Sequence, residues 1–230
     1  MNLQPAFIAM HSTRQRQRFV NTYHRGNRYC MWLFLFMAIP LMIYREELIA
    51  LYVGPKFMAS ATVLGLLYLA SPVGAGLNMV GRAAVAMGRI REITPYSIGI
   101  QLVNLALTIY LVRNLQLGAV GSALSTFLVG LFGSLFIGIP ISVRLLKISF
   151  HDWVNKSFIP GILPAISGGV IWFALHVWHP PATWFELGTF FSVGAIFYLV
   201  VLITLGLDKF ERRDLRRVFA ESSRFFNNTY

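Results

Sequence analysis

Long apolar runs separated by short polar segments dominate the chain. A helix needs roughly 20 apolar residues to cross the hydrocarbon core of a bilayer, which is about 30 Å thick. Six runs approach this length and predict membrane-spanning helices at about 29–44, 59–80, 95–112, 117–143, 158–178 and 187–207. The first run is short, contains Pro40 and is expected to continue past Arg45. The pattern predicts an all-α integral membrane protein with a cytoplasmic connector at 1–28, a six-transmembrane-helix bundle at 29–207 and a basic amphipathic tail at 208–230.

Composition agrees with a membrane protein and argues against an enzyme. Hydrophobic residues make up 56% of the chain and charged residues only 13%, against about 25% in soluble domains. The single Cys30 cannot form an internal disulfide, and no His/Cys cluster has the spacing of a metal site. His151 and Asp152 are adjacent, but a lone pair of neighbours is a weak basis for a membrane-embedded transferase. We therefore predict no cofactor, no metal and no catalytic residue.

The positive charges alternate with the predicted spans. Of the 20 Lys and Arg residues, 17 fall before the first span, in the second and fourth loops, or in the tail. The other side of the membrane holds Arg45, Lys56 and Arg113. By the positive-inside rule, both termini are predicted to be cytoplasmic. Anionic lipid headgroups explain the net charge of +11 without nucleic acid as a partner.

Polar residues inside the spans are the candidate binding residues. Gln101, Asn104 and Thr108 share one face of the third predicted helix, and Asn78 and Arg82 are four residues apart near the end of the second. Such residues at membrane depth usually face protein or water. They predict either a hydrophilic pathway or hydrogen bonds between helices, with Arg82 extending to the lipid headgroups. Both interpretations stay open at this point.

Small residues and prolines suggest packing contacts and bends. Gly121 and Ser125 form a small-xxx-small pair, which lets two helices approach closely. Pro160 and Pro164 make the fifth span bendable, either as a transporter hinge or as a static kink. Three tryptophans near the outer ends of the last two spans are interpreted as an interface belt: Trp172, Trp178 and Trp184.

Three segments carry a family resemblance. "ELIALYVGPKFMASATVLGLLYLA", "GRAAVAMGRIRE" and "LGAVGSALST" resemble the second half of polysaccharide-export flippases. These flippases belong to the multidrug/oligosaccharidyl-lipid/polysaccharide superfamily, together with the drug antiporters called MATE. Met87, Gly88 and Arg89 match the family's loop motif, and the run starting at Leu117 and Gly118 matches a helix opening two spans later.

The resemblance implies a fold of two six-helix bundles around a central cavity, of which this chain supplies one. The cavity would be completed by a missing N-terminal bundle, the preferred expectation, or by a second copy of the chain. It also implies a place in the bacterial inner (plasma) membrane and alternating access, in which the headgroup of a polyprenyl-pyrophosphate-linked oligosaccharide crosses this membrane for polysaccharide, O-antigen or exopolysaccharide biosynthesis. Arg82 would then bind the pyrophosphate, with Asn78, Gln101 and Asn104 offering hydrogen bonds. A MATE-type small-molecule antiporter and a non-transporting scaffold subunit are the alternatives.

Overall fold

The computed structural model describes residues 4–69, 71–208 and 211–212, and these residues are helical apart from turns and short connections. The helices are α1 (Gln4–Ser12), α2 (Arg16–Ile43), α3 (Arg45–Tyr52), α4 (Ala59–Leu69), α5 (Ser71–Ala75), α6 (Val80–Ala86), α7 (Ile90–Ile109), α8 (Gly118–Gly133), α9 (Ile139–Leu146), α10 (Phe150–Trp153), α11 (Ile159–Trp178) and α12 (Trp184–Val201). A 3₁₀ turn occupies Pro55–Phe57. Wider π-helical turns continue the long helices at Tyr110–Asn114, Ser134–Gly138, Val154–Phe158 and Leu202–Gly206.

The multi-pass prediction is confirmed, although one predicted span is broken. Five continuous helical stretches in the described residues are long and apolar enough to cross a membrane: Arg16–Ile43, Ile90–Asn114, Gly118–Leu146, Phe150–Trp178 and Trp184–Gly206. The run predicted at 59–80 instead forms α4 followed by α5 and α6, with a bend of 40° between the two parts. Pro72 follows this break and cannot continue the helical hydrogen bonding of α4. The described residues therefore contain five candidate spans, or six if the bent pair crosses as one.

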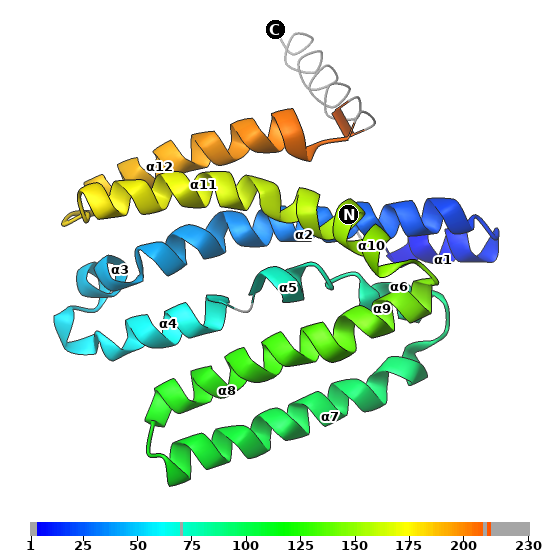
Figure 1. Ribbon diagram of the computed structural model, residues 1–230, viewed down its shortest axis with the longest axis horizontal. Coiled ribbons are helices and arrows are strands. Elements are labelled where there is room, and N and C mark those ends of the chain that lie inside the picture. Colours follow the sequence, from blue (N-terminus) through cyan, green and yellow to red (C-terminus); the bar gives the residue numbers. More distant parts are fainter. Residues whose placement is uncertain (1–3, 70, 209–210, 213–230) are drawn as a thin grey trace, which may run out of the picture.

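The long helices lie side by side in an extended layer. In Figure 1, α12, α11 and α2 form one side of the layer, and α4, α8 and α7 form the other. Two clusters of buried side chains hold the layer together. One surrounds Trp172 and Tyr198, where α2, α11 and α12 meet, and the other surrounds Tyr23 and Trp153. In contrast, α7 has no buried side chain in its α-helical part.

The basic segments meet at one end of the bundle, here called the basic end. The start of α2, the α6–α7 turn, the α9–α10 turn and the Leu202–Gly206 turn that follows α12 all lie there (Figure 1). Arg16 donates to the carbonyl of Lys147 at 3.0 Å, and Arg89 donates to the carbonyl of Leu145 at 3.4 Å. Segments that the positive-inside rule assigns to one compartment are therefore joined by direct contacts. Apart from 208 and 211–212, the predicted tail lies outside the described residues.

Candidate functional site

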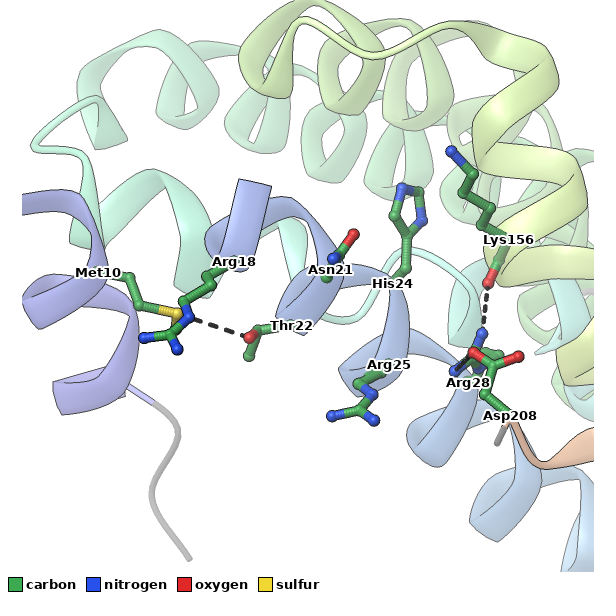
Figure 2. Close-up of a pocket in the computed structure, with 9 residues that line it drawn as sticks. All are labelled: Met10, Arg18, Asn21, Thr22, His24, Arg25, Arg28, Lys156 and Asp208. Atoms are coloured by element: carbon green, nitrogen blue, oxygen red, sulfur yellow. Dashed lines mark hydrogen bonds and ion pairs between the residues drawn. The ribbon is translucent and has the colours of Figure 1, made fainter. Parts of the chain in front are cut away.

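A polar cavity of about 580 Å³ opens at the basic end, where α1 and α2 meet the Val154–Phe158 turn before α11 (Figure 2). Helical spacing places most of its polar residues on one face of α2, because side chains three or four residues apart lie together. Thr22 of α2 donates to the sulfur of Met10 at 3.6 Å, which closes α1 over the cavity. The lining residues are Met10, Arg18, Asn21, Thr22, His24, Arg25, Arg28, Lys156 and Asp208.

Arg28 is the buried centre of this cavity wall. Its side chain is only 5% exposed and donates to the Lys156 carbonyl at 3.1 Å and to Asp208 Oδ2 at 2.9 Å. It also forms a short ion pair with the buried carboxylate of Glu211, which Arg25 Nε approaches at 3.6 Å. Arg28 therefore ties α2 to the segment before α11 and to the chain after α12. The carboxylates compensate a guanidinium that would be costly to bury alone.

Other polar side chains of the cavity are also held by neighbours. Lys156 Nζ lies 2.6 Å from Asp152 Oδ1, and His24 Nδ1 lies 2.7 Å from Ser157 Oγ. Arg18 donates to Gln15 at 2.9 Å and is exposed. The arrangement can accept an anionic group at its rim. Among the described residues, no group of three His, Cys, Asp or Glu side chains could hold a metal ion.

The predicted pathway residues lie elsewhere and are not gathered in one pocket. Asn78 is exposed in the turn before α6, Arg82 is exposed on α6, and Gln101 is exposed on α7. Within the described part of the chain, Arg82 makes no hydrogen bond or ion pair. Thr108 is half-buried near the end of α7. It does not line the cavity of Figure 2, and it lies on a different helix from Arg82.

Asn104 connects two helices. Ser125 Oγ, which is fully buried on α8, donates to Asn104 Oδ1 at 2.7 Å and to its carbonyl oxygen at 3.0 Å. This contact favours the packing interpretation for Asn104. Gly121, one turn earlier on α8, approaches Leu111 so closely that an added Cβ would lie 3.2 Å from its carbonyl carbon. Both members of the predicted small-residue pair therefore serve helix contact.

The two prolines of the fifth predicted span are stabilised by side chains of α2. A proline has no N–H to donate to the carbonyl four residues earlier, so Pro160 frees the carbonyl of Lys156 and Pro164 frees the carbonyl of Pro160. Arg28 donates to the first of these carbonyls at 3.1 Å, and Trp32 Nε1 donates to the second at 2.9 Å. These contacts favour a static kink over a free hinge.

The loop arginine Arg89 is also occupied. Its guanidinium binds both carboxylate oxygens of Glu92, at 2.6 and 2.7 Å, and these hydrogen bonds raise the pKa of Arg89 above its ordinary value. Among the expected belt residues, Trp178 and Trp184 are exposed, whereas Trp172 is fully buried and donates to the Phe191 carbonyl at 3.1 Å. The belt interpretation is therefore wrong for Trp172.

No family model, curated protein or solved structure matches the chain. The family resemblance therefore rests on the short motifs quoted above.

Sequence reasoning missed the buried ion pair. Arg28 is the last residue of the predicted connector and Glu211 lies in the predicted basic tail, and neither segment was predicted to be buried. A signal was present, because Arg28 directly precedes the first apolar run and Glu211 follows the last one. When the first span begins and the last span ends on the same side of a bundle, these two charges can come together.

Proposed function

We propose that the chain is one bundle of a transporter related to the polysaccharide-export flippases. It moves a polyprenyl-pyrophosphate-linked oligosaccharide across the plasma membrane by alternating access. A second bundle, such as a second copy of the chain, completes the cavity. The headgroup crosses between the bundles while the polyprenyl tail stays in the lipid.

The observation that carries this proposal is the exposure of Gln101 on α7. Only 6% of the most apolar stretch of this span is buried, so the side chain of Gln101 has no cover from its own bundle. A polar side chain at membrane depth is costly against lipid and normally faces protein or water. A second bundle with a water-filled cavity between the two supplies that environment.

Arg82 is the residue proposed to bind the pyrophosphate. It is exposed on α6 and has no partner in the described part of the chain, whereas Arg89 in the following loop is held by Glu92. A guanidinium can bind phosphate oxygens through two parallel hydrogen bonds. Asn78 lies four residues before Arg82, also exposed, and is placed to bond the same headgroup.

Cysteine accessibility tests the water-filled cavity. In a Cys30→Ser background, Gln101→Cys should react with a membrane-impermeant maleimide in cell membranes, because the reactive thiolate forms in water. Leu102→Cys is the matched control, since Leu102 is 61% exposed but points about 100° away around the same helix. It should stay unreactive in lipid. Equal labelling at both positions, or none at Gln101→Cys, contradicts the cavity and favours a scaffold.

Export measurements test the role of Arg82. Hydrogen bonds to a charged group contribute about 1.5–3 kcal/mol, and Arg82→Ala would remove this contribution to cargo binding. The variant should therefore reduce polysaccharide export roughly 10- to 100-fold at unchanged protein level. Arg113→Ala, which removes an exposed cation beyond the end of α7, should leave export unchanged. Normal export by Arg82→Ala would exclude the assigned role.

A further inference from the structure

Helix α7 and the helix formed by α8 and the turn after it enclose an apolar groove. The groove lies between the contact of the two helices and the basic end. The helices are held together by the close approach at Gly121 and by the bond between Ser125 and Asn104. From there toward the basic end, their facing sides leave a groove of about 570 Å³. The side chains lining it are almost entirely apolar: Pro95, Tyr96, Gly99, Ile100, Val103, Leu107, Leu128, Val129, Phe132, Gly133, Phe136 and Ile137.

Glycine keeps the groove open, and its length matches one leaflet. A Cβ added at Gly99 would meet nothing within 4 Å, so the space beside it is unfilled. Along α7 the lining extends from Pro95 to Leu107, about 18 Å at 1.5 Å per residue. One leaflet of a bilayer contributes about 15 Å to the hydrocarbon core. The groove therefore has the length and chemistry of a site for one lipid chain.

A polar cavity continues the groove at its basic end. This second cavity, of about 400 Å³, shares Pro95 and Tyr96 with the groove and is also lined by Arg91, Glu92 and Arg144. Arg89 already holds both oxygens of Glu92. Arg91 and Arg144 are exposed and form no ion pair within the described residues. Arg144 acts electrostatically on the Glu92 carboxylate, so the mouth of the chain-length apolar groove holds one carboxylate and three guanidiniums, of which Arg91 and Arg144 form no ion pair in the described residues.

We infer that this composite site binds one anionic phospholipid of the surrounding bilayer. The phosphate binds Arg91 and Arg144, and one acyl chain lies between α7 and α8. A soluble anion would leave the groove empty, and a zwitterionic lipid would place its own cation beside the two arginines. Guanidinium–phosphate pairing and burial of the chain act together only for a negatively charged amphiphile. This site does not depend on the proposed transport function.

Quenching by brominated lipids tests the site on the full chain in phosphatidylcholine vesicles. Phe132→Trp places a reporter in the groove, and Phe173→Trp, which is 59% exposed on α11, places a reference reporter outside it. Emission of the parent chain is subtracted from both. Each arginine near an anionic lipid contributes about fivefold in affinity. We therefore expect the relative binding constant at the groove reporter to be about 25-fold higher for brominated phosphatidylglycerol than for brominated phosphatidylcholine, from two arginines. The reference reporter should show a much smaller preference.

Two variants separate the headgroup from the chain. Arg91→Gln with Arg144→Gln should reduce the preference at the groove reporter to that of the reference. Gly99→Leu fills open space and should reduce quenching by both lipids, whereas Gly188→Leu, which also enters open space on α12, should not. Equal preference at the two reporters would identify an ordinary boundary lipid and overturn the inference. So would a preference that survives the arginine substitutions.

Discussion

Replacement of Arg28 should destabilise the bundle more than any other single charge substitution at the basic end. Arg28→Met keeps the length of the side chain but leaves the carboxylate of Glu211, only 1% exposed, without its main partner. The Lys156 carbonyl also loses its donor. Removing one partner of a buried pair costs about 3–5 kcal/mol. For a chain of this size, this corresponds to a decrease in Tm of roughly 6–20 °C.

A double-mutant cycle with Glu211→Gln measures the pairing itself. Each single variant should be destabilised, and the double variant should be more stable than additivity predicts by up to about 3 kcal/mol, because neither charge is then left unpaired. The measurement is the thermal unfolding of detergent-solubilised protein at one fixed heating rate. Arg18→Met is the matched control on the same cavity and should stay within about 0.5 kcal/mol. Additive effects, or a single variant that unfolds like the parent, would refute the buried pair.

Two further substitutions probe the helix contacts. Ser125→Ala removes the bond to Asn104 and should lower the free energy of unfolding by about 0.6 kcal/mol, whereas Thr126→Ala, whose hydroxyl bonds only within its own helix, should have a smaller effect in the same melting assay. Trp32→Phe leaves the freed Pro160 carbonyl unpaired and should cost about 1–3 kcal/mol. Unchanged melting of this variant would instead support a hinge at that proline.

The membrane class of the fold could be predicted from the sequence because the length of the apolar runs and the alternation of charge between them identify spanning helices directly. The break near residue 70 was less predictable. Hydropathy does not distinguish a straight span from a bent one. The sequence around Pro72 and its neighbouring glycines is compatible with a break and equally with a continuous apolar run. The upstream start of α2 at Arg16 was missed for a related reason, since a helix can extend beyond the apolar part that lies in the bilayer.

The candidate site was harder to predict because residue type indicates polarity but not orientation. Gln101 and Asn104 share a face by spacing, yet Asn104 bonds Ser125 across the helix contact while Gln101 is exposed. The partner of a polar side chain depends on which neighbouring helix approaches, and that depends on small residues such as Gly121. Helical periodicity alone cannot supply this information.

The cations at the basic end divide by whether the protein itself compensates them. Arg28, Arg89 and Lys156 each face a carboxylate at hydrogen-bond distance or closer: Arg28 pairs with the distant Glu211, whereas Arg89 and Lys156 pair with carboxylates three and four residues away along their own segments. Arg82 and Arg91 have no such partner among the described residues, although they lie within ten positions of Arg89. A charge retained without an internal partner keeps its full attraction for an external anion. The uncompensated arginines are therefore where a phosphate should bind first, whether it belongs to a cargo or to a resident lipid.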